Sequence, residues 1–212
     1  MHIPDGFLNI ATVGTTYAIS AGGVSYGLRE ARRKLTEKHV PMMGIMAAFI
    51  FAAQMFNFPI VGGTSGHLIG AALAAILLGP WAGVMIMSCV LIVQCLIFQD
   101  GGLLALGANV LNMGIVASFA SYYFYRGTLW LVGETRRGVL LGSFVAAWGS
   151  VFLASIFCAI ELAVSGTVPI RVALPAMAGW HTLIGIGEGV ITVAVLSFVM
   201  ATRRDLLELQ RV

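Results

Sequence analysis

The first two residues of the chain, Met1 and His2, carry three nitrogen atoms that could bind one metal ion. The α-amine of Met1, the backbone amide nitrogen of His2 and the Nδ1 atom of its imidazole can close a five-membered and a six-membered chelate ring. Deprotonating a backbone amide requires a strongly polarising ion that accepts planar nitrogen coordination, which favours Ni²⁺ or Cu²⁺. Mg²⁺ and Ca²⁺ prefer oxygen ligands. The opening residues therefore predict a nitrogen-rich transition-metal site that still lacks one donor.

The missing fourth donor is expected to be another histidine on the same side of a membrane. His67 is the natural candidate, because it follows an irregular loop and its neutral imidazole can donate a lone pair. His39 is excluded, because it lies in a segment that the charge pattern assigns to the cytoplasm. The competing interpretation is that His2 is an ordinary terminal residue and that His67 is bonded to nearby carbonyl groups.

A ligating imidazole usually needs a hydrogen bond to its second nitrogen. Residues close in sequence could provide it, although each could equally cap a helix or a turn: Asp5, Asn57, Thr64 and Ser65. His181 and Glu188 are seven residues apart, so they lie on nearly the same face of the last helix. Ionisable groups inside a membrane are functional candidates, with a polar contact between helices as the alternative. Glu161 and Arg171 are expected to form only an exposed ion pair.

The composition excludes water as the main solvent of the chain. Of its 212 residues, 59% are hydrophobic and 10% are charged, whereas about 25% of a soluble domain is charged. Lys and Arg lie in short clusters between apolar runs, a pattern typical of membrane topology and not of nucleic-acid binding. The three cysteines, Cys89, Cys95 and Cys158, lie in apolar runs without C-x-x-C spacing and are expected to be small buried residues.

Apolar runs predict an all-α, multi-spanning membrane protein with one transmembrane domain over residues 1–212. About seven helices are expected, near residues 10–28, 42–58, 66–79, 81–98, 103–125, 138–163 and 177–200. If the basic segment 29–41 is cytoplasmic, an odd number of helices places Arg126, Arg136, Arg137, Arg203, Arg204 and Arg211 inside as well. The N-terminus is then outside and the C-terminus cytoplasmic, and residues 1–9 form an extracytoplasmic metal-binding segment.

The start of the chain is expected to remain in the mature protein. No Lys or Arg precedes position 29, so the basic region of a secretory signal is missing. The large His2 side chain should also prevent removal of the initiator methionine. Met1 is therefore expected to keep a free amine.

The third predicted helix is too short to cross a bilayer. From Gly66 to Gly79 it covers about 21 Å of a hydrocarbon core of about 30 Å. A tight inner turn is expected at Gly79-Pro80, so the loop at residues 57–65 must dip inward from the outer side, covered by protein or trapped water. This places His67 in the first turn of the helix, at the floor of an outward-facing cavity.

Several segments of the sequence resemble the CbiM/NikM family, the substrate-specific components of energy-coupling-factor transporters for nickel and cobalt. The opening segment Met1–Leu8 matches the M-H-I-P-D-G-x-L start of that family. Other segments that look like family motifs are Asn57–Ile60, Gly63–Leu68, Gln99–Gly102, Gly107–Asn109 and Asn112–Gly114. The resemblance implies that the Met1 amine, the His2 amide and imidazole, and His67 hold Ni²⁺ or Co²⁺ as the transported substrate. No catalytic cofactor is implied.

The resemblance also implies the partners and the location of the protein. It predicts a multi-pass protein of a prokaryotic cell (inner) membrane that works with a transmembrane coupling component and two cytosolic ATPase subunits. A small accessory membrane subunit often accompanies them. The sequence has no G-x-x-x-x-G-K-[ST] segment, so neither ATP hydrolysis nor any other enzymatic activity is expected of this chain.

Two other functions are compatible with parts of the sequence. Gly63–Gly66 matches the G-x-S-G of rhomboid-like intramembrane serine proteases, with Ser65 and His181 as the pair. The glycines after His181 come one residue later than that family requires, at positions 185 and 189. A self-sufficient, ion-driven metal transporter would need several intramembrane carboxylates or histidines, and only His181 and Glu188 qualify.

Overall fold

The computed structural model describes residues 1–37, 39–60 and 64–203, most of which are helical. In chain order the elements are α1 (Ile10–Lys34), α2 (His39–Gln54), β1 (Phe58–Ile60), β2 (Thr64–Gly66), α3 (Ala71–Leu78), α4 (Pro80–Phe98), α5 (Leu106–Asn109), η1 (Val110–Val116), α6 (Ala117–Val132), α7 (Arg136–Val164) and α8 (Ile170–Thr202). η1 is a π-helix that joins α5 to α6, so residues 106–132 form one continuous helix. Three residues used in the sequence-based predictions, Gly63, Arg204 and Arg211, lie outside the described residues.

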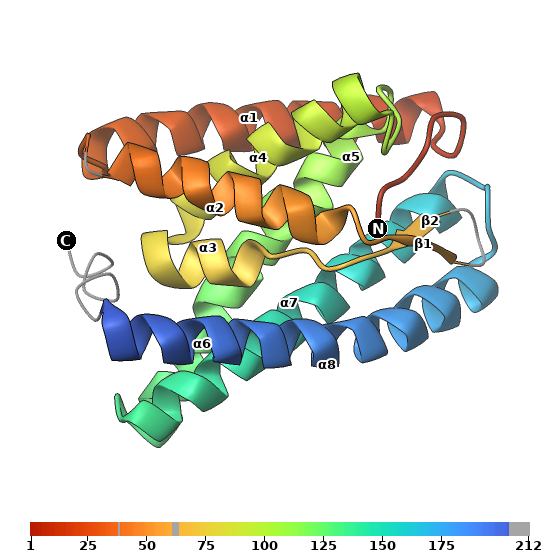
Figure 1. The fold of residues 1–212 in the computed structure, drawn as a ribbon. Helices are drawn as coiled ribbons and strands as arrows, with labels where there is room; N and C mark the ends of the chain where they lie inside the picture. Colours follow the sequence, from red (N-terminus) through yellow and green to blue (C-terminus); the bar gives the residue numbers. More distant parts are fainter. Residues whose placement is uncertain (38, 61–63, 204–212) are drawn as a thin grey trace.

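The described helices form a bundle of seven helical segments, which confirms the predicted number (Figure 1). Among the described residues, three helices are long and apolar enough to cross a membrane, namely α4, α7 and α8, and α2 is a shorter apolar helix. The first residue of the chain and the last turn of α8 lie toward opposite ends of the bundle, as an odd number of crossings requires. The assignment of the N-terminus to the outside remains a prediction.

Local signals set the ends of several helices. Asn9 caps α1 by accepting a hydrogen bond from the backbone N–H of Thr12 at 2.8 Å. Gly79 ends α3 and starts α4 with a φ of +86°, a conformation that glycine adopts without strain. Pro80 follows as the first residue of α4, where its missing N–H is harmless. The predicted tight turn at Gly79-Pro80 is therefore confirmed.

The all-α prediction missed a small antiparallel hairpin. Strand β1 pairs with β2, and Phe58 lies opposite Gly66. Strand β2 ends at Gly66 and residues 67–70 are non-helical, so His67 does not lie in a helix and α3 begins only at Ala71. The predicted helical position of His67 was wrong. The reason is that backbone groups in this stretch bond to β1 and to Glu188 of α8, partners that no local pattern reveals.

The stretch just before α3 is buried, whereas Asn57, Phe58 and Pro59 of the segment predicted to dip inward are exposed, so the dip of residues 57–65 stays a prediction. α3 has eight residues, all buried, which corresponds to about 12 Å of helix. The stretch that leads into it is also covered by protein, because Thr64, His67 and Ile69 are buried. Irregular backbone at this depth is tolerated because surrounding helices provide its hydrogen-bond partners.

The last helix starts earlier than the sequence predicts. α8 begins at Ile170, whereas the apolar pattern predicted a start near residue 177. Pro175 lies inside α8 in its second turn. The helix tolerates it there, because only the hydrogen bond to the carbonyl of Arg171 is lost.

Two expectations about single side chains were wrong. Glu161 is buried in α7 and accepts a hydrogen bond of 2.6 Å from Asn112 of η1, so it forms no exposed ion pair with Arg171. Cys89 is exposed on α4, whereas Cys95 and Cys158 are buried as expected. In both cases an apolar run does not show which face of a helix meets another helix.

Candidate metal centre

The N-terminal segment, residues 1–9, enters the bundle, and its first residue lies beside the β1–β2 hairpin (Figure 1). Met1 and Ile3 are fully buried, and His2 is 4% exposed. Gly6, with a φ of +85°, lies in the turn that connects the buried residues to α1. The first residues of the chain are therefore part of the protein interior.

Polar groups between α4 and η1 hold this segment in place. The Asn109 side chain accepts a hydrogen bond from the Ile3 backbone N–H at 2.8 Å and donates one to the Ile3 carbonyl at 3.2 Å. The backbone N–H of Gly102 donates to the same carbonyl at 2.9 Å. The Asp5 carboxylate accepts hydrogen bonds from the two backbone N–H groups of residues 103–104, at 3.1 and 2.7 Å. Together these contacts fix how far the chain reaches toward the hairpin.

Replacing Asn109 with Ala is expected to lower the free energy of unfolding by about 1–3 kcal/mol, because the buried N–H of Ile3 loses its partner. Chemical unfolding of the purified protein in detergent measures the change. Thr202→Ala, at the exposed end of α8, is the control and should stay within about 0.5 kcal/mol of the native protein. Equal stability of the Asn109 variant and the control would show that the clamp on Ile3 contributes nothing.

Ser65 of β2 fixes the positions of the first two backbone nitrogens. The Met1 amine donates hydrogen bonds to the Ser65 carbonyl oxygen and, at 3.1 Å, to Ser65 Oγ. The backbone N–H of His2 donates to the same Oγ at 3.1 Å. Burial lowers the pKa of the Met1 amine to about 4, so the amine is neutral at pH 7. A neutral amine that donates both of its N–H groups to Ser65 still has its lone pair available.

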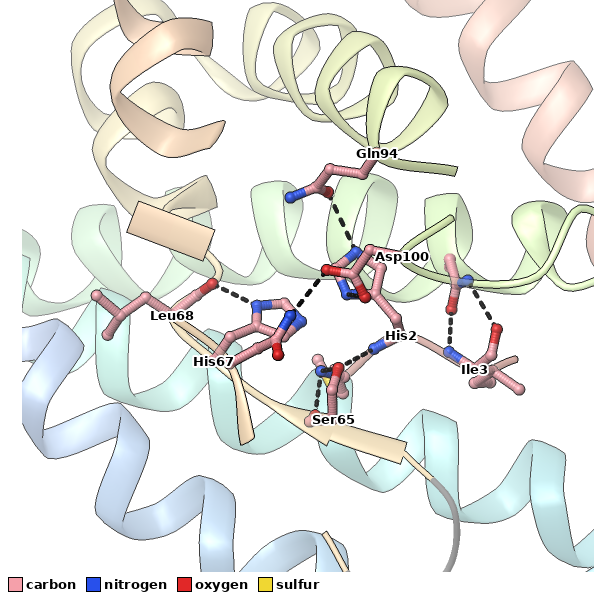
Figure 2. Close-up of polar contacts among 10 residues, drawn as sticks. His2, Ile3, Ser65, His67, Leu68, Gln94 and Asp100 are labelled. Carbon is pink, nitrogen blue, oxygen red and sulfur yellow. Dashed lines mark hydrogen bonds and ion pairs between the residues drawn. The ribbon is translucent and has the colours of Figure 1, made fainter. Parts of the chain in front are cut away.

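Two side chains contact the imidazole of His2 (Figure 2). Its Nε2 lies 3.1 Å from Gln94 Oε1, and its Nδ1 lies 3.2 Å from Asp100 Oδ1. Both oxygens accept, and a neutral ring can donate to only one of them. The hydrogen bond to Gln94 places the proton on Nε2, which leaves Nδ1 with its lone pair and without a hydrogen-bond partner among the described residues. Burial lowers the pKa of His2 to about 3, so its contact with Asp100 is not an ion pair at neutral pH. Asn57 Nδ2 donates to Asp100 Oδ2 at 3.0 Å and orients that carboxylate.

The imidazole of His67 lies beside that of His2. The ring centroids are 4.5 Å apart and the planes differ by 24° (Figure 2). Nδ1 of His67 lies 2.7 Å from the Leu68 carbonyl and must donate to it, which leaves the lone pair on Nε2. That Nε2 is buried and has no hydrogen-bond partner among the described residues. Burial lowers the pKa of His67 well below its usual value, and the nearby Met1 amine and His2 lower it further.

The arrangement can bind a cation that accepts nitrogen donors. The Met1 amine and the His2 backbone nitrogen each lie 3.1 Å from Ser65 Oγ, and the centroids of the His2 and His67 rings are 4.5 Å apart. Buried acceptors without partners are unfavourable, and a bound cation would satisfy them. Within the described ranges, no group of three or more His, Cys, Asp or Glu side chains could hold a metal. A metal site at this position therefore depends on the two backbone nitrogens.

The residues predicted to support the imidazoles differ in what they contact. Ser65 contacts the N-terminal nitrogens, and Asn57 reaches the His2 ring through the carboxylate that it orients. Asp5 and Thr64 bind other groups instead, the first through backbone N–H groups and the second by donating to a methionine sulfur at 3.0 Å. On α8, Glu188 accepts hydrogen bonds from backbone N–H groups that follow His67.

The pair that a serine protease would need is not formed among the described residues. Ser65 Oγ accepts hydrogen bonds from the nitrogens of Met1 and His2. His181 is fully buried, its Nδ1 lies 2.8 Å from the Met177 carbonyl, and its Nε2 has no partner within the described part of the chain. These contacts give no support to the protease interpretation.

Three residues that hold the N-terminal segment were given no role from the sequence: Gln94, Asp100 and Asn109. A polar residue inside an apolar helix was the signal that could have pointed to Gln94. Asp100 and Asn109 lie in segments that resembled family motifs but whose partners were unknown. Their contacts with the first three residues bridge about a hundred positions of sequence, which spacing cannot reveal.

Comparison with known proteins identifies the family and the fold of this chain. The family model described as "Cobalt uptake substrate-specific transmembrane region" matches residues 2–206. A putative fused nickel transport protein NikMN of Archaeoglobus fulgidus is 46% identical over 211 residues, which cover 98% of this chain and 68% of that protein. The cobalt transport protein CbiM of Sorangium cellulosum is 30% identical, with 98% of this chain and 95% of that protein covered. The crystal structure of a truncated transition metal transporter superposes with a TM-score of 0.88 at 36% identity, covering 95% of this chain and 99% of that one.

Proposed function

Because the chain belongs to the CbiM/NikM family and is a multi-pass membrane component of nickel or cobalt transport, we propose that it is the metal-capture subunit of an importer. The metal ion is its substrate and not a catalytic cofactor. The observation that carries the proposal is the burial of unpartnered nitrogen lone pairs at one place, His67 Nε2 beside the neutral His2 ring. A buried polar atom without a partner is unfavourable, and a bound ion is one way to satisfy it.

In this proposal four nitrogen atoms bind the ion. The Met1 amine, the His2 amide and His2 Nδ1 form the two fused chelate rings, and His67 Nε2 is the fourth donor. Ser65 supports the first two of these atoms, and Gln94 fixes the tautomer of the His2 ring. Planar coordination by four nitrogens and the usual order of affinities favour Ni²⁺, with Co²⁺ as the second substrate.

The spectrum of bound nickel tests the proposal directly. The purified chain with one equivalent of Ni²⁺ is expected to give a diamagnetic complex with the visible absorption of a square-planar d⁸ ion. Only a strong donor set that includes the deprotonated amide produces this state. Zn²⁺, which has a filled d shell, is the matched control and should give no such band. A paramagnetic nickel complex would contradict amide ligation.

Other subunits complete the transporter in this proposal. The sequence contains no P-loop, so two cytosolic ATPases and a transmembrane coupling component of the energy-coupling-factor type would supply the work of import. Relatives named as fused nickel transport proteins are longer than this chain, which spans 68% of one and 65% of another. A small accessory membrane subunit would correspond to the additional part of those relatives.

A further inference from the structure

The segment that carries His67 is held at its far side by two helices. The carboxylate of Glu188, on α8, accepts hydrogen bonds from the backbone N–H of Ile69 at 2.6 Å and of Gly70 at 2.8 Å. Gln54, on α2, donates from Nε2 to the carbonyl of Ile69 at 2.6 Å. The peptide groups on both sides of Ile69 therefore have partners on α8 and on α2.

The use of a distant carboxylate at this position is unusual for a helix start. Gly70 is the N-cap of α3, has a φ of +80° and provides no side-chain cap. In most helices a side chain at this position caps the first turn, whereas here a residue 118 positions away binds the N–H of Gly70 itself. Glu188 is 2% exposed, and a buried carboxylate is costly unless specific hydrogen bonds compensate for lost hydration.

On the side that faces α2, the segment is in close contact with that helix. A Cβ atom built on Gly70 would lie 2.9 Å from the Ile50 side chain of α2, so the backbone already lies against that helix. Gln54 lies one turn further along α2 and is fully buried. The segment can therefore adopt its position only while α2 and α8 keep their present separation.

The position of this backbone determines the orientation of the His67 ring. Nδ1 of His67 donates to the carbonyl of Leu68, the residue just before Ile69. That hydrogen bond leaves the lone pair on Nε2 and directs the ring. A displaced Ile69–Gly70 backbone would move the Leu68 carbonyl and the ring with it.

We propose that Glu188 is a positioning residue for metal capture, which holds the backbone after His67 so that His67 Nε2 completes the nitrogen site. The inference rests on the proposed function. It also gives a route to release: a movement of α8 relative to α2 withdraws the fourth donor, while the N-terminal segment stays held by Asn109 and Gln94. Glu188 itself does not touch the metal ion.

A double-mutant cycle tests this inference with Ni²⁺ as the probe. We expect Glu188→Ala in the full chain to weaken nickel affinity by about 10–100-fold, as loss of a contact that orients a ligand does. In a chain that already carries His67→Ala, the same change should alter affinity by less than about twofold, because both changes remove the same donor. The nickel spectrum of the Glu188→Ala protein should resemble that of the His67→Ala protein. Loss of stability alone would not change this spectrum.

Two further variants keep the test decisive. Glu188→Gln keeps one acceptor and the same size, so it should lose less affinity than Glu188→Ala, and it replaces that variant in the cycle if Glu188→Ala does not fold. Thr192→Val removes a buried polar group one turn along α8 and should leave affinity and spectrum unchanged.

The possible results separate this inference from the proposed function. Equal nickel affinity in the native and His67→Ala proteins would refute the donor set itself. Weak binding in His67→Ala with native binding and spectrum in both Glu188 variants would overturn only the role of Glu188. Fully additive losses in the double variant would also overturn it, because Glu188 would then act independently of His67.

Discussion

Nickel binding is expected to be lost when His2 is replaced by Ala. The variant loses Nδ1 and with it the six-membered chelate ring, so the amide nitrogen is no longer held between two other donors. The loss should exceed the roughly 10–100-fold that removal of a supporting contact costs, because a metal ligand itself is missing. Calorimetric titration of the purified protein with Ni²⁺ measures it.

A second histidine provides the matched control for this change. His39 lies at the start of α2, where its Nδ1 is 3.0 Å from the backbone nitrogen of Thr36. His39→Ala removes an imidazole remote from the N-terminal segment and should leave nickel affinity unchanged. Native affinity in His2→Ala, or an equal loss in both variants, would refute the proposed donor set.

One glycine added before Met1 is expected to abolish high-affinity nickel binding although every side chain is kept. The Met1 nitrogen would become an amide nitrogen, which could bind a metal ion only after losing its proton, and the new amine would lie one residue away from the position that Ser65 fixes. Met1 is fully buried and its nitrogen contacts both polar oxygens of Ser65, so the interior has no space for the extra residue. The expected loss again exceeds about 100-fold, measured by equilibrium dialysis with Ni²⁺.

The position of the addition is the control in this experiment. The same glycine added after Val212 leaves the amine in place and should bind nickel like the native chain. Enzymatic removal of the leading glycine should restore binding, because it regenerates the Met1 amine. Unchanged affinity with the leading glycine present would show that the amine is not a ligand.

Different parts of the fold hold the two halves of the candidate site. The N-terminal donors are held by Asn109 and Gln94, from the helices α4 and α5. The His67 segment is held by α2 and α8 through Gln54 and Glu188. Among the described residues of the segment that carries His67, Ser65 is the one that contacts the N-terminal nitrogens. A site divided in this way can open by a relative movement of helices without unfolding either half.

The sequence alone determined the membrane class and the number of helices, and it predicted the most distinctive candidate donors. Helix number follows from the lengths of apolar runs, because a segment exposed to lipid must bond its backbone polar groups within its own helix. The three donors of Met1 and His2 follow from covalent structure, because neighbouring atoms of one chain close chelate rings whatever the fold. The sequence also predicted that the stretch before α3 dips inward, since its helix was too short to span.

Only the tertiary structure decided what surrounds those donors. His67 was a candidate from its place in the chain, yet its non-helical backbone depends on Glu188, more than a hundred residues away. Gln94, Asp100 and Asn109 contact the first three residues across similar separations. These contacts arise from the packing of whole helices, and periodicity describes the face of one helix and not the neighbour it meets. The first two residues and His67 could therefore be proposed as donors from the sequence, whereas the residues that position them required the fold.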